Sequence, residues 1–141
     1  MDVLDRMFEA AKAARDRAYA PYSRFPVGAV VVTESGALFV GCNVENAAYP
    51  NGLCAEAVAI GQMAVAGERR ITDVMILGAG DEPITPCGAC RQRLLEFSRD
   101  DTRVHLVNIS GRKDTVLLTD LLPRAFSRRQ LDDLARENNQ R

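Results

Sequence analysis

Apolar residues recur along the chain with two spacings, which together predict an alternation of helices and strands. Between Val3 and Tyr19, apolar side chains repeat every three or four residues and charged residues fill the other positions, which is typical of an amphipathic helix. The β-branched run from Val27 to Thr33 predicts a buried strand, and a turn at residues 34–36 leads into a second strand over residues 37–44. The same criteria predict three further strands, at residues 71–77, 104–109 and 115–118, and three further helices, at residues 54–66, 87–98 and 131–137.

This order of elements, α-β-β-α-β-α-β-β-α, predicts a fold of the α/β class. We expect a three-layer α/β/α sandwich, in which a five-stranded mixed sheet is covered by helices on both faces. In this arrangement the apolar face of each helix packs against an apolar face of the sheet. No linker, repeat or low-complexity segment interrupts the pattern. We therefore expect residues 1–141 to form a single domain, with the polar end at about residues 138–141 frayed.

Composition and charge narrow the class of partner. The 141 residues are 47% hydrophobic and 26% charged, and 18 basic and 19 acidic residues give a formal net charge of -1. This balance provides no basic surface for nucleic acid or for an anionic membrane, so we expect a small neutral substrate. The charged N-terminus lacks an apolar signal core, and the longest apolar run, residues 27–32, is too short to cross a bilayer. A cytoplasmic protein is expected, in which the four cysteines are metal ligands or free thiols.

The first candidate for chemistry is the motif Pro86-Cys87-Gly88-Ala89-Cys90. Two cysteines three positions apart at a helix start can chelate one tetrahedral metal ion. The free N–H groups and the positive dipole end of the helix also favour thiolates there. Taken alone, the motif leaves a redox dithiol or two buried free cysteines as alternatives.

A second stretch, around Cys54 and Glu56, favours the metal. Cys54 opens another predicted helix and can supply a third thiolate, and Glu56 is a carboxylate in an otherwise apolar segment, where burial without a partner is costly. Three thiolates leave one tetrahedral position open, as in catalytic zinc sites, where the metal activates water and Glu56 can transfer the proton. A fourth ligand, Cys42 or His105, would make the site structural. Cys42 is more simply a small buried residue, and His105 a packed strand residue.

These residues together are similar to those of a known family. Cys54-Ala55-Glu56, followed by Pro86-Cys87-Gly88-Ala89-Cys90-Arg91-Gln92, resembles the motifs of the small homotetrameric zinc-dependent cytidine deaminases of the cytidine/deoxycytidylate deaminase superfamily. The resemblance continues in order through residues 19–29, 41–47 and 121–126, and so covers almost the whole chain. It implies hydrolytic deamination of cytidine or deoxycytidine to uridine or deoxyuridine and ammonia, a reaction of pyrimidine salvage.

The resemblance also implies a role for each matched position. One zinc ion per subunit would be bound by Cys54, Cys87 and Cys90, with Glu56 as the catalytic proton shuttle. Five further positions resemble substrate-binding residues: Phe25 against the pyrimidine, Asn43 and Glu45 on the ribose hydroxyls, Ala55 on the base through its backbone, and Phe126 from a neighbouring subunit. A homotetramer is implied, because that last contact needs a second subunit.

Two departures from the family pattern bear on the chemistry. Many members carry Arg directly after the catalytic Glu, where it is thought to offset the charge of three thiolates on zinc, and this chain has Ala57. We expect Arg91 and the two helix ends to supply that offset. The loop at residues 49–53 also differs, which keeps open a same-fold deaminase of another aminopyrimidine, such as a blasticidin-type antibiotic or a modified cytosine nucleoside. A zinc-stabilised non-catalytic module is the alternative of a different class.

Overall fold

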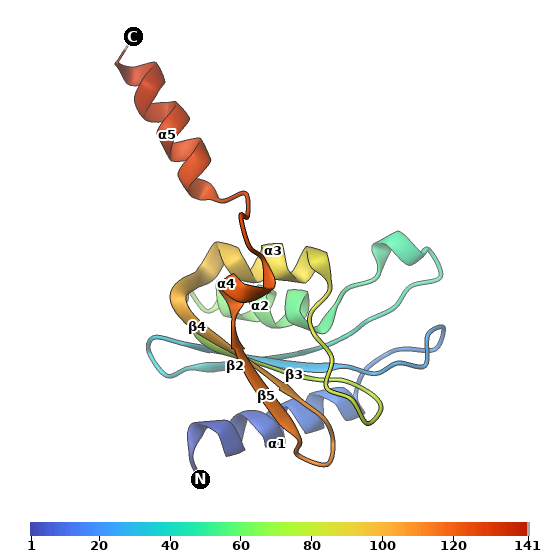
Figure 1. Ribbon diagram of the computed structural model, residues 1–141. Coiled ribbons are helices and arrows are strands. Elements are labelled where there is room, and N and C mark those ends of the chain that lie inside the picture. The colour runs from blue at the N-terminus through green and yellow to red at the C-terminus, as the bar shows by residue number, and fades with distance from the viewer. Residues whose placement is uncertain (141) are drawn as a thin grey trace.

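The computed structural model describes residues 1–140, which form a five-stranded sheet between two layers of helices (Figure 1). Helix α1 (Val3–Asp16) covers one face of the sheet, and helices α2 (Ala55–Val65) and α3 (Gly88–Phe97) cover the other. The strands are β1 (Gly28–Thr33), β2 (Leu38–Cys42), β3 (Ile71–Leu77), β4 (Ser98–Val107) and β5 (Lys113–Leu117). Three short or peripheral helices complete the described chain: the 3-10 turn η1 (Tyr49–Asn51), α4 (Leu118–Leu121) and α5 (Arg128–Asn139). The predicted three-layer α/β/α sandwich is confirmed.

The sheet is mixed, with the strand order β2-β1-β3-β4-β5. Strand β1 runs antiparallel to both β2 and β3, β5 runs antiparallel to β4, and β3 and β4 are parallel. A parallel pair needs a crossover connection, which α3 supplies. Gly28, which starts β1, pairs with Cys42 at the end of β2 and with Leu77 at the end of β3. The loops after β2 and β3 and the loop before β1 therefore gather at one end of the sheet.

The sheet buries a separate apolar core on each face. Val31 belongs to the cluster that includes Leu94 of α3, whereas its neighbour Val30 belongs to the cluster that includes Met7 of α1. All six residues of β1 are buried. A strand covered on both faces needs apolar residues at successive positions, which accounts for the unbroken β-branched run that predicted it.

Two glycines allow the helices to lie directly on the sheet. A Cβ atom at Gly28 would come within 2.0 Å of the Ala11 carbonyl oxygen in α1, and a Cβ atom at Gly41 within 2.2 Å of the Ala55 carbonyl oxygen in α2. Any larger residue would push the helix away. The contact at Gly41 sets the position of the first turn of α2, which directly follows Cys54.

Several boundaries differ from those predicted. Strand β4 begins at Ser98 instead of residue 104, and α4 begins at Leu118, the residue predicted to end the last strand. Helix α5 begins at Arg128 instead of residue 131, because Ser127 and Gln130 form a capping box. Helix α2 is apolar nearly all round, a pattern that predicts an enclosed helix, but Val65 near its end is 91% exposed.

Helix α5 extends away from the sandwich (Figure 1), and none of its residues is buried. The segment predicted to fray ends at Arg141, which lies outside the described residues. Within residues 1–140, no helix combines the length and the apolar character needed to cross a membrane.

Candidate metal centre and active site

Helices α2 and α3 begin at the same end of the sheet, and a cysteine occupies the N-cap position of each. Cys54 is the N-cap of α2 and Cys87 is the N-cap of α3, both with extended backbone. Neither helix has a side-chain oxygen as its cap, so the N–H groups and the positive dipole ends of both helix starts lie beside the thiols. The two caps lie near each other because β2 and β3, the strands that precede them, both end beside Gly28.

The three predicted metal ligands form one cluster. The Sγ atoms of Cys54, Cys87 and Cys90 all lie within 4.8 Å of one another, and those of Cys54 and Cys87 are 3.8 Å apart. Cys90 is buried, Cys54 is half-buried and Cys87 is exposed. Three thiols at these distances can bind one tetrahedral ion and leave its fourth position free of protein.

The alternative ligands lie elsewhere in the fold. Among the residues that the structure describes, the cluster of metal-binding groups contains neither Cys42 nor His105. The Nε2 atom of His105 is 2.8 Å from Asp73 Oδ2, and its Nδ1 atom is 2.9 Å from Thr115 Oγ1. Both ring nitrogens thus have partners within the sheet, and the thiol cluster has the three ligands of an open site.

The electrostatics of the cluster favour a bound cation. Burial raises the pKa of the Cys54 thiol and of the Cys90 thiol, and the charge of Glu56 raises both further. Although partial burial opposes its ionisation, hydrogen bonds from the Cys90 backbone and from the other two thiols lower the pKa of Cys87. Three thiolates this close together repel one another unless a cation lies between them. Thiolate is among the preferred ligands of Zn²⁺, so the donor set fits zinc.

The catalytic candidate Glu56 lies beside the thiols, in the first turn of α2. It is 4% exposed, and burial raises the pKa of its carboxyl; its own backbone N–H and the charge of Arg93 offset only part of this effect. A raised pKa suits a carboxyl group that must both give and take a proton near neutral pH.

A cavity of about 290 Å³ opens beside these groups. Its volume is close to the lower end of the range of about 300–1,000 Å³ that is typical of small-molecule sites. The helix starts and three loops contribute its walls, which consist of Ser23, Phe25, Val27, Asn43, Cys54, Ala55, Glu56, Ile84, Thr85 and Cys87. Three of the predicted substrate-binding residues, Phe25, Asn43 and Ala55, therefore line the same cavity as Glu56.

The Asn43 side chain also forms hydrogen bonds with the backbone of the loop that carries Phe25. Its Oδ1 atom accepts a hydrogen bond from the Val27 N–H at 2.9 Å, and its Nδ2 atom donates to the Phe25 carbonyl at 2.9 Å. Phe25 is 39% exposed. The amide that was predicted to hold the ribose thus also fixes the backbone of the predicted aromatic contact.

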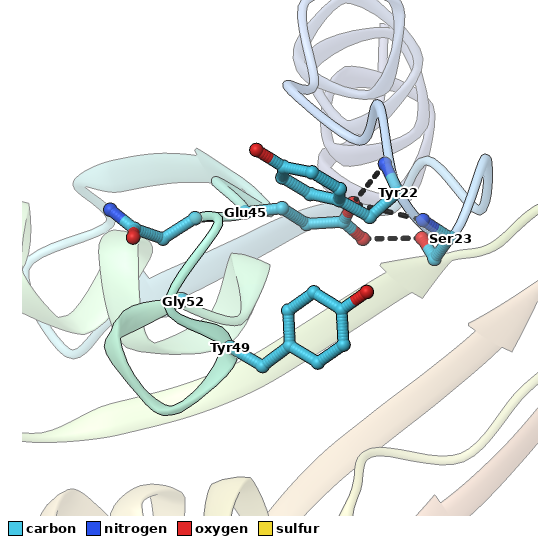
Figure 2. A pocket seen from close by; sticks show the side chains of 6 residues that line it. Tyr22, Ser23, Glu45, Tyr49 and Gly52 are labelled. Carbon is cyan, nitrogen blue, oxygen red and sulfur yellow. Dashed lines mark hydrogen bonds between the residues drawn. The ribbon is translucent and has the colours of Figure 1, made fainter.

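Glu45 lines a neighbouring hollow that shares Ser23 with the cavity (Figure 2). Its carboxylate accepts hydrogen bonds from the Tyr22 N–H at 2.9 Å, from the Ser23 N–H at 3.0 Å and from the Ser23 hydroxyl. These bonds, that of the Ser23 hydroxyl above all, lower the pKa of Glu45. Across the hollow, Figure 2 shows Tyr22 facing Tyr49 of the 49–53 loop, with ring centroids 5.8 Å apart.

Phe126 lies outside the cavity. Its side chain is 61% exposed, and the Gln92 side chain donates to its carbonyl oxygen at 2.9 Å. It does not line the cavity of its own chain. Its implied role needs a second subunit and stays a prediction.

A cation other than the expected one contacts the thiols. Arg91 was expected to offset their charge, but its guanidinium donates to the carbonyl oxygens of Pro86 at 2.8 Å and Leu121 at 2.9 Å. Arg93 instead donates from Nη1 to Cys90 Sγ at 3.4 Å. Sequence reasoning missed Arg93; the available signal was its spacing of three residues from Cys90, which puts both on one helix face.

The fold and this site define a class: an α/β/α domain in which three clustered thiols, a donor set that fits one zinc ion, lie beside a buried carboxylate. Residues 1–106 match the family model described as the cytidine and deoxycytidylate deaminase zinc-binding region. The chain therefore belongs to the cytidine and deoxycytidylate deaminase family, as its sequence motifs indicated.

Individual relatives cover most of the chain. A cytidine deaminase of Sporosarcina psychrophila is 39% identical over 137 residues, which are 97% of this chain and 100% of that protein. A cytidine deaminase of Mycobacterium tuberculosis is 40% identical over 121 residues, which are 85% of this chain and 84% of that protein. The crystal structure of a cytidine deaminase from Burkholderia pseudomallei superposes with a TM-score of 0.83 and 45% identity, covering 89% of this chain and all of that one.

Proposed function

We propose that this protein is a zinc-dependent hydrolase that deaminates cytidine, deoxycytidine or both to the corresponding uridine nucleoside, with release of ammonia. The observation that carries the proposal is the open three-thiol cluster beside the buried Glu56, on the wall of one small cavity. The relatives named above, which are cytidine deaminases, support the same activity. A non-catalytic zinc module would need a fourth protein ligand, and the clustered groups among the described residues number three.

The chemistry divides between the metal and one side chain. When bound by Cys54, Cys87 and Cys90, zinc supplies the Lewis acid that makes water a nucleophile at neutral pH. Glu56 would take a proton from the water molecule that adds to C4 of the pyrimidine and give it to N3. It would then carry the second proton of that water to the amino group, so that the C4–N bond breaks, ammonia leaves and the water's oxygen stays on C4 as the carbonyl. Because the Glu56 carboxyl is buried at the wall of the cavity, a bound substrate would shield it from bulk water while it carries that proton.

The walls of the cavity favour a nucleoside over a nucleotide. The ten lining residues include no Lys or Arg, so they offer no cation to pair with a phosphate group. Amide and carboxylate groups can instead hydrogen-bond the two hydroxyls of a ribose. We assign the pyrimidine to Phe25 and the Ala55 backbone, and the sugar to Asn43 and Glu45.

We also propose an oligomeric state, a cellular location and a class of partner for the protein. We propose a homotetramer in which the exposed Phe126 of one subunit completes the site of its neighbour. Residues 1–141 would act as a single domain in the cytoplasm, where thiols stay reduced, in the salvage of pyrimidine nucleosides. The formal net charge of -1 supports a small-molecule enzyme that binds neither nucleic acid nor membrane.

The test uses a Glu56→Gln variant and a panel of substrates. The variant should keep its zinc and its fold and lose about 100- to 10,000-fold in kcat, because only the proton transfer is removed. Glu96→Gln, which removes an exposed carboxylate from α3, is the matched control and should keep full activity. Zinc-loaded protein that releases no ammonia from cytidine or deoxycytidine would disprove the proposed activity.

A further inference from the structure

Arg93 is the one guanidinium group that the structure shows in contact with the thiol cluster within residues 1–140. It lies one turn after Cys90 on α3, and its Nη1 atom donates to Cys90 Sγ at 3.4 Å. The guanidinium therefore contacts one of the three thiols directly, and the Sγ atoms of the other two lie within 4.8 Å of that one.

The centre needs such a cation because of its net charge. Three thiolates on a divalent zinc ion leave a charge of about -1, in a site that also holds the Glu56 carboxylate. The starts of α2 and α3 each contribute only about half a positive charge. Arg91 is held by the carbonyl oxygens of Pro86 and Leu121 and by the Thr85 hydroxyl.

We propose that Arg93 is a positioning residue that orients the Cys90 sulfur and offsets the negative charge of the zinc–thiolate centre. The inference rests on the zinc site of the proposed function, but its main measurement is metal affinity. If the protein binds zinc tightly and has no deaminase activity, the proposed function fails and this inference stands.

The sign of the effect follows from the charge balance. When a divalent ion replaces the protons of three thiols, the local charge falls by one unit. A neighbouring guanidinium favours that change, so its removal should weaken zinc binding. Outer-shell partners of metal ligands typically contribute about 10- to 100-fold to affinity. Because Arg93 is exposed and its field is screened by water, we expect the lower end, about tenfold.

The experiment compares three full-length variants by competition for zinc with a chromogenic chelator. Arg93→Gln should bind zinc about tenfold more weakly, and Arg93→Lys, which keeps the charge, should recover most of that loss. Arg112→Gln removes an exposed guanidinium that pairs with Glu82, and should bind zinc as the unaltered protein does. Equal thermal unfolding of the zinc-free proteins shows that the fold is retained.

Cobalt substitution gives a second measurement that does not depend on turnover. A hydrogen bond lowers the energy of the sulfur lone pairs, so its loss in Arg93→Gln should move the thiolate-to-cobalt charge-transfer band to longer wavelength. Unaltered zinc affinity in Arg93→Gln would overturn the inference. Equal losses in the Gln and Lys variants would overturn it as well, because the charge would then be irrelevant.

Discussion

Gly41 offers a direct test of how the fold positions the site. In a Gly41→Ala variant, the added Cβ atom would lie 2.2 Å from the Ala55 carbonyl oxygen and 2.6 Å from the Ala59 backbone nitrogen. Both atoms belong to the backbone of α2, so no side-chain rotation can relieve the overlap. To restore an ordinary contact, the first half of α2 must move away from β2 by about 1 Å.

That movement should damage stability and activity together. Overpacking of this kind costs about 1–3 kcal/mol of folding free energy. The displaced turn carries Glu56 and directly follows Cys54, and a misplacement of about 1 Å in a catalytic group can cost on the order of 100-fold in rate. Urea denaturation of the zinc-free protein would measure the loss of stability, and the initial rate of ammonia release would measure the loss of activity. The zinc content after purification would show whether the displaced turn also weakens the metal site.

Gly61 in the same helix is the matched control. A Cβ atom there meets nothing within 4 Å, so Gly61→Ala adds a better helix former without a clash and should stabilise the protein by about 0.5–1 kcal/mol. If Gly41→Ala unfolds at the same urea concentration as the unaltered protein and keeps its rate, the close approach of α2 to β2 does not position the site.

Three further predictions concern the loops and the sheet. Because the pKa of Glu45 is lowered from its ordinary value of 4.5, its carboxylate stabilises the fold at any pH above 4.5. Glu45→Gln should therefore have a lower Tm than the unaltered protein at pH 7, and this difference in Tm should disappear as the pH falls through the lowered pKa. Asp73→Ala leaves the buried His105 Nε2 without its partner and should cost about 1–3 kcal/mol in urea denaturation. Asn43→Ala should raise KM for 2′,3′-dideoxycytidine as well as for cytidine, because it frees the Phe25 backbone; a normal KM for the dideoxy substrate would show that Asn43 serves only the hydroxyls.

The sequence predicts best those strands whose residues are buried on both faces, such as β1 and β3. The first half of β4 was not predicted, because its sequence lacks the apolar pattern of a strand: Arg99, Asp100 and Asp101 are charged, and Asp100 and Asp101 are exposed. Contacts far apart in the chain hold this segment in the sheet: Ser98 pairs with Ile71, and the Thr102 hydroxyl donates to the Ile71 carbonyl at 2.7 Å. No local pattern of residues reports such contacts.

In the metal centre, too, the features that depend on local sequence could be predicted and those that depend on tertiary contacts could not. The positions of Cys54, Cys87 and Glu56 could be predicted because their determinants are local: each lies at the start of a helical run. The contact of Arg93 was not predicted, because its spacing from Cys90 is a weak signal: an exposed arginine on a helix most often faces only water. Its contact with Cys90 becomes informative only once Arg91, the more obvious cation, is seen to bind backbone oxygens instead.

Asn43 and Glu45 hold a loop in place and still have hydrogen-bonding capacity for the sugar contact that we propose for them. A side-chain amide has two donors and two acceptor sites, and Asn43 uses one of each on Phe25 and Val27. A carboxylate has about four acceptor sites, and Glu45 uses three on Tyr22 and Ser23. Each residue keeps capacity for one hydroxyl group. A ribose bound there would order the same loop that places Phe25, so recognition of the sugar and of the base would reinforce each other.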